Sequence, residues 1–559
     1  MDKKRILVIG GASLEASEFI KKELDLGIEV VCLDNLSSSD IKNIEEFNKY
    51  SNFVFINHDI NIPFFIVADE VYSFITNDNE NIKRNIRAIL EKNKIENKKS
   101  VISIVGTGYV GLTTAAILSN VGYKVYCIDV DEKKIDIVKS GKSYFYEPGM
   151  DEFVKKGIES GNLIPTTDYS EAIGNSDIAF ICVGTPSNDD GSVNLSYVLD
   201  SAIEIVKNIK NNFIIVQKST VQVNTNKKIK KIIEEYKNGY DINLVSCPEF
   251  LREGSAIFDT LFFDRLVVGG NNIDAINKIV DIYRDIYNYA KNIDHSTFNF
   301  YAFNNVNPKY IEKLSDFDKR VVVTNIETAE LIKTTANSFL ALKISFANMI
   351  SRLCDRTGAE SDKLMDGIGL DPRIGRAFLY PGLGYGGGCF PKDINGMIQT
   401  ANFYDVDCDI LESADVLNNN QVYFALYKIK KLLGEDLCNK KIAFLGLSFK
   451  PGTSDVRKSP SIRLINKLLD EGAIINAYDP EAIEESKKEL NHKNLKYADK
   501  IEDVFNDADC IVLGTEWKEF IDFDYSKIIN KMKSLNFVDG RNAMNIKYLK
   551  NLNFKIERF

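Results

Sequence analysis

Histidine and closely spaced cysteines are scarce in this chain of 559 residues. Only three histidines occur, His58, His295 and His492, and no two of the nine cysteines are spaced as Cys-x-x-Cys. Neither a zinc site nor a disulfide framework fits this pattern, so we expect no metal. A general base or nucleophile is therefore expected among the lysines, cysteines and carboxylates.

Long apolar runs and an excess of positive charge are also missing. No apolar run reaches the roughly 18 residues of a membrane span, and the N-terminus MDKKRILVIGG lacks a signal-peptide pattern. Lys and Arg number 70 against 80 Asp and Glu, a net charge of -10, whereas nucleic-acid binding needs a basic face. We expect a cytoplasmic protein with no nucleic-acid or membrane partner.

What is present is ordinary globular material, with 44% hydrophobic and 27% charged residues. At about 100 to 200 residues per domain, the length predicts three to five domains. Three segments, 5–34, 101–129 and 441–479, each read as strand, turn, helix and a second strand that ends in an aspartate. This pattern predicts an α/β fold with parallel, doubly wound sheets. Residues 327–356 contain no Gly or Pro and predict one long helix.

The second of these segments carries GTGYVG at 106–111, followed about 20 residues later by Asp129. Glycines in this position let the pyrophosphate of a dinucleotide approach the N-terminus of the helix, and the acid binds the ribose hydroxyls. A carboxylate there favours NAD over NADP. The turn residues that we expect to bind NAD, with Lys134 one helical turn after the acid, are Gly106, Gly108, Tyr109, Val110 and Gly111.

Two further buried strands are expected to end at the same edge of this sheet. One precedes Gly184 and Thr185, and the other precedes Ser219 and Thr220. Ligand-binding turns occupy the carboxyl edge of parallel sheets, so these hydroxyls are candidates for cofactor or substrate contacts. Ordinary Ser/Thr turn chemistry is the alternative.

Two pairs of polar residues have a spacing of four. Glu249 and Glu253 share a face if their segment is helical, and one of them could then activate a water. Lys333 and Asn337 share a face of the long helix, and such a pair suits an anionic oxygen. Solvated charges are the alternative for both pairs.

The loop 382–393 crowds five glycines around Cys389, and Asp393 follows four residues later. Such a loop lets the backbone approach a ligand and exposes the thiol. Cationic groups or a helix N-terminus would make it a thiolate nucleophile. An inert buried thiol is the usual alternative for a single cysteine, but the glycines favour a catalytic one.

In combination, these motifs resemble the UDP-glucose/GDP-mannose dehydrogenase family over about residues 100–559, and its glucose-specific members most. The motifs that carry the resemblance are GTGYVG (106–111), VGTP (183–186), KST (218–220), PEFLREG (248–254), AELIKTTAN (329–337), GYGGGCFPKD (384–393), GLSFKPGTSDVRKSP (446–460) and DGR (539–541). Tyr385 and Gly388 depart from the Phe and Ser that are frequent in the glucose-specific enzymes.

The resemblance implies a division of the chain into an NAD-binding Rossmann domain at 100–320 with an insertion at about 290–320, a central helical region at 321–437 for dimerisation and the catalytic cysteine, and a UDP-sugar domain at 438–559. Residues 1–80 instead resemble the start of an extended short-chain dehydrogenase, followed by a linker at 81–99 with helical spacing of its isoleucines. Ser13 and Ala16 replace glycines of that family's phosphate loop, and no Tyr-x-x-x-Lys pair follows, so we expect no catalysis from this module.

The resemblance also implies residue roles. Cys389 is the nucleophile, Lys333 and Asn337 stabilise the oxyanion, Asp393 supports them, and Thr220, Glu249 and Glu253 organise water and proton transfer. The implied cofactor contacts beyond the glycine turn are Gly184, Thr185, Ser219, Thr220, Glu253 and Arg457. The implied substrate contacts, besides Lys333 and Asn337, are Phe250, Leu251, Arg252, Glu253, Arg373, Phe378, Leu379, Tyr380, Gly382, Tyr385, Gly386, Phe449, Lys450 and Arg541.

The implied reaction is a four-electron oxidation of UDP-glucose to UDP-glucuronate by two NAD, through a thiohemiacetal and a thioester on the cysteine. A homodimer or larger homo-oligomer is expected. Two alternatives remain at this point. One is a dehydrogenase of GDP-mannose or a UDP-N-acetylhexosamine, and the other is a sugar-nucleotide sensor without turnover, which the combination of Cys389, Lys333, Asn337 and Asp393 disfavours.

Overall fold

The computed structural model describes residues 4–58, 68, 70–75, 99–188, 190–236, 239–293 and 317–559. Its strands form three sheets of four, eight and six strands, and all pairings except that of β10 with β11 are parallel. The prediction of an α/β fold with parallel Rossmann-like sheets and a long central helix is confirmed. The expected linker helix at 81–99 and most of the expected insertion lie outside the described residues.

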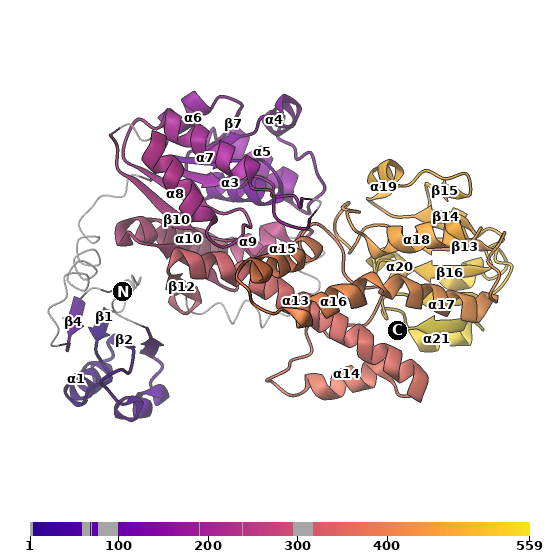
Figure 1. Ribbon diagram of the computed structural model, residues 1–559. Helices are drawn as coiled ribbons and strands as arrows, with labels where there is room; N and C mark the ends of the chain where they lie inside the picture. Colours follow the sequence, from indigo (N-terminus) through magenta and orange to yellow (C-terminus); the bar gives the residue numbers. More distant parts are fainter. Residues whose placement is uncertain are drawn as a thin grey trace.

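The N-terminal unit is a small sheet with strand order β3-β2-β1-β4, set apart at the lower left of Figure 1. Its elements are β1 (Arg5–Ile9), α1 (Leu14–Asp25), β2 (Glu29–Asp34), η1 (Ile41–Asn43), η2 (Glu45–Lys49), β3 (Phe53–Asn57) and β4 (Glu70–Ser73). Arg5 at the start of β1 forms an ion pair with Asp318 of the second domain. At least one ion pair therefore joins the N-terminal unit to the second domain.

The second domain has the strand order β12-β11-β10-β9-β8-β5-β6-β7. Its strands are β5 (Ile102–Val105), β6 (Val125–Ile128), β7 (Leu163–Thr166), β8 (Ile178–Ile181), β9 (Phe213–Gln217), β10 (Ile242–Ser246), β11 (Leu266–Gly270) and β12 (Val321–Thr324). Its helices are α3 (Tyr109–Val121), α4 (Glu132–Lys139), α5 (Met150–Glu159), α6 (Tyr169–Gly174), α7 (Ser196–Asn208), α8 (Thr225–Tyr236), α9 (Ala256–Leu261), α10 (Ile273–Asn292) and the short η5 (Asp318–Arg320).

Two boundaries in this domain differ from the sequence-based division. Helix α10 continues to Asn292, so residue 290 is helical and does not begin an irregular insertion. Strand β12 pairs with β11, so the sheet includes residues 321–324, which we had placed in the central region. Four consecutive residues of β12 give too short an apolar pattern to be distinguished from the start of a helix.

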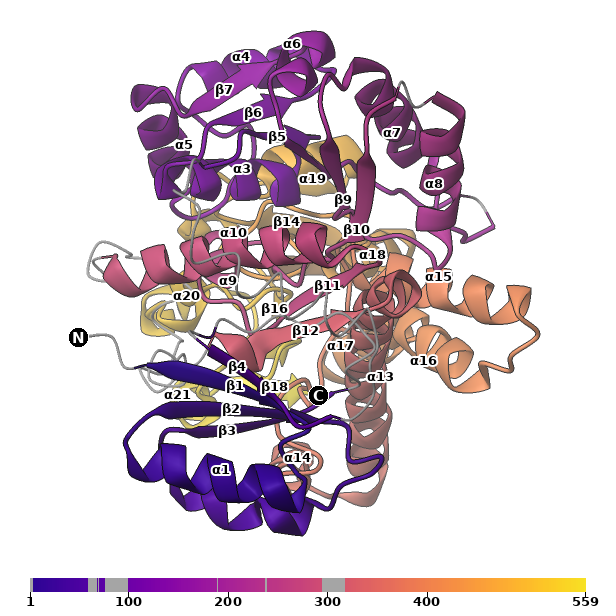
Figure 2. The same ribbon diagram turned by 90° about the vertical axis from the view of Figure 1, so that its left-hand side faces the viewer.

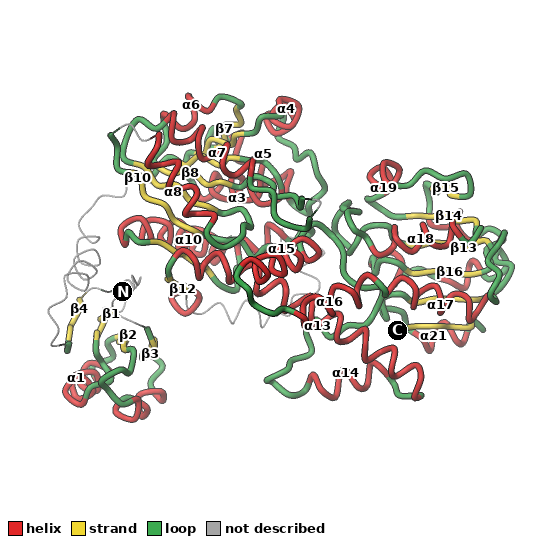
Figure 3. The backbone as a smooth tube through the Cα atoms, viewed as in Figure 1, coloured by secondary structure: helices red, strands yellow, loops and turns green. Residues whose placement is uncertain are grey.

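The predicted long helix is α13 (Ile326–Thr357), and it links the second and third domains (Figures 1 and 3). The Asn325 side chain caps its N-terminus by accepting the Thr328 N–H, and Gly358 ends it in a left-handed conformation. The helices that pack around it are α14 (Ser361–Gly369), α15 (Phe390–Phe403), α16 (Asp409–Asn419) and α17 (Gln421–Leu433). Figure 2 shows α13 along most of its length. One face of α13 stays exposed, so the helix is only partly buried.

The third domain has the strand order β15-β14-β13-β16-β17-β18, with helices on both faces. Its strands are β13 (Lys441–Leu445), β14 (Ile474–Tyr478), β15 (Leu495–Tyr497), β16 (Cys510–Leu513), β17 (Asn536–Asp539) and β18 (Lys555–Arg558). Its helices are α18 (Pro460–Asp470), α19 (Ile483–Glu489), η6 (Ile501–Phe505), α20 (Lys518–Ile521), η7 (Tyr525–Ile528) and α21 (Ile546–Asn551).

Candidate active site

The turn between β5 and α3 has the space that a dinucleotide needs. Gly106 has a φ of +94°, which only glycine adopts easily, and it opens the turn. A Cβ on Gly108 would meet no atom within 4 Å, and this residue caps α3 without a side-chain hydrogen bond. The first amides of α3 are thus left for a ligand, and the residues present fit the pyrophosphate of NAD.

Asp129 lies directly after β6, half-buried beside this turn. Its Oδ2 accepts hydrogen bonds from the Thr107 N–H at 3.0 Å and the Thr107 hydroxyl at 2.6 Å, and Lys134 Nζ lies 4.0 Å from Oδ1. Burial alone would raise the pKa of Asp129, but these hydrogen bonds outweigh it and hold the pKa below its ordinary value. The side chain is therefore a carboxylate, as expected for a group that binds a ribose diol and repels a 2′-phosphate.

A cavity of about 400 Å³ lies between the second domain, α13 and the third domain. It brings together most of the residues that the sequence singled out. The predicted residues in its wall are Tyr109, Val110, Glu249, Phe250, Leu251, Arg252, Glu253, Lys333, Asn337, Phe378, Gly386, Cys389, Phe449 and Lys450.

Cys389 sits at the N-cap of α15 and exposes its thiol to this cavity. The protein around it makes ionisation costly, so desolvation raises the pKa of the Cys389 thiol to about 11, although Lys333 acts in the opposite direction. The resting side chain is therefore a thiol, and not the thiolate expected from the helix N-terminus and the nearby cation. A base must remove its proton during any covalent chemistry.

Lys333 and Asn337 do share one face of α13, and both are buried. Lys333 Nζ lies 3.1 Å from Glu249 Oε1. Burial alone would lower the pKa of Lys333, but Glu249, Cys389 and Asp393 outweigh it and keep the pKa above its ordinary value. Lys333 thus stays a cation, which suits charge stabilisation better than proton abstraction.

Asp393 lies behind the cavity wall. Its Oδ2 accepts a hydrogen bond from Asn337 Nδ2 at 2.6 Å, and Lys392 forms an ion pair with the same carboxylate. An amide that donates one N–H to a carboxylate is fixed in orientation, so its second N–H is aimed by the protein. Asp393 is therefore placed to orient Asn337.

Glu249 and Glu253 lie on a loop between β10 and α9, so the helical arrangement considered for them is absent. Glu253 Oε1 accepts a hydrogen bond from Arg457 of the third domain at 3.2 Å. Burial and the neighbouring Asp455 raise the pKa of Glu253 to about 7, while Arg457 opposes them. A carboxyl group with this pKa can exchange protons near neutral pH.

The predicted hydroxyl groups lie at the carboxyl edge of the sheet. The Thr185 hydroxyl donates to the Thr220 carbonyl at 2.9 Å, and the Ser219 hydroxyl donates to the Val183 carbonyl at 2.7 Å. A Cβ on Gly184 would meet nothing within 4 Å, so this turn is open as well. Thr220 and Arg457 are not part of the cavity wall. The roles of Gly184, Thr185, Ser219, Thr220 and Arg457 as cofactor contacts remain predictions.

Several predicted substrate contacts lie away from the cavity. Arg373 is exposed and paired with Asp371, and Tyr380 is exposed beneath Arg376. The remaining ones, which do not line the cavity, are Leu379, Gly382 and Tyr385, which are buried, and Arg541, which is half-buried in the third domain. The motifs identify these positions along the chain, but they do not predict in which direction each side chain points.

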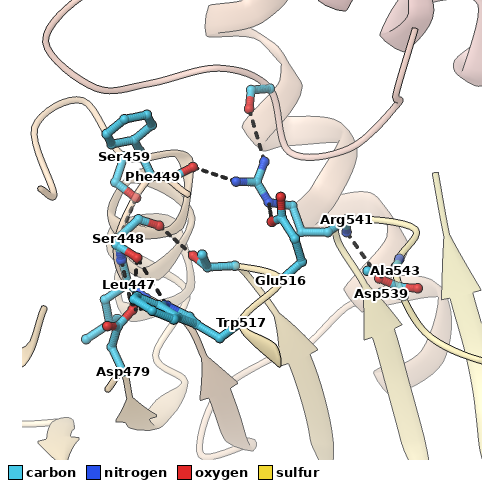
Figure 4. A network of polar contacts seen from close by, with 12 residues as sticks. Leu447, Ser448, Phe449, Ser459, Asp479, Glu516, Trp517, Asp539, Arg541 and Ala543 are labelled. Atoms are coloured by element: carbon cyan, nitrogen blue, oxygen red, sulfur yellow. Dashed lines mark hydrogen bonds and ion pairs between the residues drawn. The ribbon is translucent and has the colours of Figure 1, made fainter. Parts of the chain in front are cut away.

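Arg541 belongs to a polar network at the carboxyl edge of the third sheet (Figure 4). Its Nη2 donates to the Phe449 carbonyl at 2.5 Å, and its Nε lies 2.7 Å from Glu516 Oε2. Arg541 thereby holds the loop that brings Phe449 and Lys450 to the cavity.

Asp479 occupies the corresponding place at the end of β14 (Figure 4). Its Oδ2 accepts hydrogen bonds from the Leu447 N–H at 2.7 Å, the Ser448 N–H at 3.0 Å and Trp517 Nε1 at 3.2 Å. Donors from the protein thus occupy the Asp479 carboxylate, whereas the surroundings of Asp129 are more open.

Sequence reasoning missed three buried groups at the site. Lys218 and Tyr283 line the cavity, and Glu147 accepts the N–H groups of Gly254 and Ala256 at 2.6 and 2.7 Å. Burial raises the pKa of Glu147 to about 8. Lys218 lies in the quoted KST motif, but no sequence signal marks Tyr283 or Glu147, because their partners are more than 60 residues away.

The fold and the cavity define a Rossmann-type, dinucleotide-binding protein with an exposed cysteine in a cavity between two sheet domains. Family models match its three parts: the NAD binding domain of the UDP-glucose/GDP-mannose dehydrogenase family at 100–287, the central domain at 327–420 and the UDP binding domain at 443–546.

Relatives of known name agree with these matches. "UDP-glucose 6-dehydrogenase YwqF" of Bacillus subtilis is 38% identical over 443 residues, which cover 79% of this chain and 93% of the relative. "UDP-glucose 6-dehydrogenase" of Rickettsia bellii is 38% identical over 454 residues, covering 81% and 98%. The chain belongs to the UDP-glucose/GDP-mannose dehydrogenase family, and it is an NAD-dependent oxidoreductase.

Solved structures show the same architecture. A UDP-glucose dehydrogenase from Pyrobaculum islandicum superposes with a TM-score of 0.70 at 30% identity, covering 81% of this chain and 97% of that one. A UDP-D-ManNAc dehydrogenase from Pyrococcus horikoshii gives a TM-score of 0.67 at 25% identity, covering 82% and 98%. None of the helices in the described part of the chain is both long and apolar enough to cross a bilayer.

Proposed function

We propose that this enzyme oxidises UDP-glucose to UDP-glucuronate in two steps, through a covalent intermediate on Cys389. The observation that carries the proposal is the convergence of Cys389, Lys333 and Asn337 on one cavity that adjoins the open dinucleotide turn. The names of the 38% identical relatives support the choice of sugar.

Lys333 and Asn337 are the groups that stabilise negative charge on the substrate oxygen. Lys333 stays charged because Glu249 neutralises the cost of burying it, and Asp393 holds Asn337 by one N–H. An ammonium and an amide fixed in this way need no rearrangement when an alkoxide or a tetrahedral anion forms. NAD, when bound, accepts the hydride in each oxidation.

Cys389 supplies the nucleophile for the aldehyde. Its thiol proton must leave before sulfur can add, because the pKa of about 11 keeps it protonated at rest. Glu249 and Glu253, with Thr220, are the proposed groups for proton transfer and for the water that hydrolyses the thioester. Glu253 is suited to this role because its raised pKa of about 7 makes proton uptake and release nearly balanced at neutral pH.

An exposed apolar face of α13 supports a homodimer as the working form. Phe339, Phe346, Met349 and Leu353 are 41 to 60% exposed on this helix, and their burial against a second copy would remove apolar surface from water. Light scattering of the purified chain tests this assignment, with a monomer as the contrary result.

A different nucleotide sugar is the second candidate, favoured by the similarity to the UDP-D-ManNAc dehydrogenase of P. horikoshii. The deciding experiment is NADH formation by the purified enzyme against UDP-glucose, GDP-mannose and UDP-N-acetylhexosamines. We expect UDP-glucose to be preferred and to yield two NADH per sugar. One NADH per sugar with a free aldehyde would contradict the two-step scheme, and preference for another sugar would contradict the substrate.

A further inference from the structure

The cavity wall contains a buried ammonium group that the proposed chemistry does not use. Lys218 follows β9, is only 4% exposed and lines the same cavity as Cys389. Its Nζ donates a hydrogen bond to the Tyr283 hydroxyl at 2.6 Å. An ammonium group has three N–H donors, and a buried cation without an acidic partner is costly.

The partners of Lys218 are neutral. Burial raises the pKa of Tyr283 well above its ordinary value, and Tyr283 donates its own hydrogen bond to Cys247. Burial likewise raises the pKa of the nearby Cys182 thiol to about 12. The acid near this cluster is Glu249, but its two oxygens already serve Lys333 and the Leu251 N–H, at 3.1 and 2.7 Å.

The other cations of the cavity have acidic neighbours. Arg252 pairs with Asp259 at 2.6 Å, and Lys333 pairs with Glu249. Arg265 lies near Asp264, and Lys450 lies among Glu253, Asp259 and Glu147. Among the described residues, Lys218 is thus the cavity cation whose hydrogen-bond partner is a neutral hydroxyl.

The proposed oxidation creates the missing counter-charge. A neutral CH₂OH group enters the cavity and a carboxylate with two charged oxygens leaves it, while Lys333, the proposed partner of one oxygen, already shares its charge with Glu249. A charge-assisted hydrogen bond from an ammonium to a carboxylate is among the stronger hydrogen bonds in proteins. We propose that Lys218, held by Tyr283, forms a carboxylate subsite that binds the sugar acid made by the reaction.

This inference rests on the proposed function and predicts recognition of product over substrate. The test is calorimetric binding of UDP-glucuronate and UDP-glucose, without NAD, to the full chain and to Lys218→Met, Lys218→Arg and Tyr283→Phe. Lys218→Met should weaken UDP-glucuronate binding about tenfold and UDP-glucose binding less than twofold. Lys218→Arg keeps the charge and should retain the selectivity for UDP-glucuronate. Tyr283→Phe removes the hydroxyl that holds the ammonium group, and it should weaken binding of UDP-glucuronate alone about threefold.

The possible results distinguish failure of the carboxylate subsite from failure of the proposed function. Equal losses for both nucleotides, or no loss for UDP-glucuronate, would overturn the subsite while leaving the proposed function intact. If the wild-type chain binds neither nucleotide, the proposed function fails and the subsite with it. Circular dichroism checks the folding of Lys218→Met, and inhibition of NADH formation by UDP-glucuronate in Tyr283→Phe repeats the test without removing the lysine.

Discussion

The first two strand-turn-helix units of the chain both have glycine at the turn, but only the second has an open position at the start of its helix. A Cβ on Gly11 would meet Cys32 Sγ at 2.5 Å, whereas a Cβ on Gly108 would meet nothing within 4 Å. The Ser13 hydroxyl caps α1 by accepting the Ala16 N–H, whereas Gly108 leaves the start of α3 uncapped. Gly11 is thus required by internal packing, as are Gly106 and Gly111 of the second turn, whereas Gly108 faces open space that a ligand can occupy.

The acids that follow the two units differ in the same way. Asp34 is 5% exposed, and its oxygens accept from the Ala12 and Leu36 N–H groups and the Ser39 hydroxyl. Asp129 accepts as many hydrogen bonds, two from Thr107 and one from the Asp131 N–H, but it is less buried and lies beside an open turn. The same sequence pattern therefore describes one turn that closes on itself and one that can hold a dinucleotide.

The largest expected effect falls on the body of the enzyme after residue 99. Cys389→Ser should lower formation of UDP-glucuronate by about three orders of magnitude, because serine is a poor nucleophile for the aldehyde. Binding of UDP-glucose and NAD should stay within about twofold, since serine is nearly the same size as cysteine and the residue is exposed to the cavity. Product analysis by NMR measures this, and unchanged turnover would remove Cys389 from the mechanism.

Thiol alkylation contrasts the two regions directly. Because the pKa of Cys389 is about 11, its thiolate fraction rises tenfold per pH unit below that value, so alkylation by iodoacetamide should speed up about 100-fold between pH 7 and 9. Cys32 of the first unit is fully buried, and burial raises its pKa further, so it should not react in the folded chain. Mass spectrometry of the modified peptides checks both, and a rate independent of pH would contradict the thiol assignment.

The glycine comparison is sharpened by matched substitutions. Gly108→Val should fold normally, because the space is empty and its φ of -60° suits any residue, but should weaken NAD binding about 100-fold. Gly11→Ala should lower the melting temperature by several degrees through the clash with Cys32, with NAD affinity unchanged. If Gly108→Val binds NAD normally, the turn is not the pyrophosphate site.

Substitutions of Asp129 and Asp34 compare the same two units, with smaller expected effects on NAD binding and stability. Asp129→Asn should weaken NAD binding about tenfold and narrow the preference over NADP, because the charge that repels a 2′-phosphate is lost. Asp34→Asn should leave cofactor choice unchanged and cost about 1 to 3 kcal/mol of stability, because an amide N–H would face buried N–H donors. Steady-state kinetics with both cofactors and thermal unfolding measure the two effects.

Sequence reasoning predicted the parts of the molecule whose signal is local. The uninterrupted segment 327–356 gave α13 almost to its ends, and the strand before Gly106 and the acid after β6 gave the dinucleotide turn. What failed depended on distant partners. The protonated state of Cys389 follows from packing around it, and the Lys218–Tyr283 pair joins residues 65 positions apart.

The smallest effect is expected from removing the N-terminal unit. A chain that starts near residue 99 should fold and keep its NADH formation within about twofold, because none of the described residues of the first unit lines the cavity that contains Cys389. It loses the ion pair between Arg5 and Asp318, but Asp318 retains Arg284 at 2.9 Å, so the cost should be about 1 kcal/mol or less. Arg5→Met in the full chain is the matched control, because it removes the ion pair with Asp318, together with the pair to Glu29 inside the first unit, while the unit itself stays in place. If the shortened chain is insoluble or inactive while Arg5→Met is normal, the first unit supports the enzyme through more than this contact.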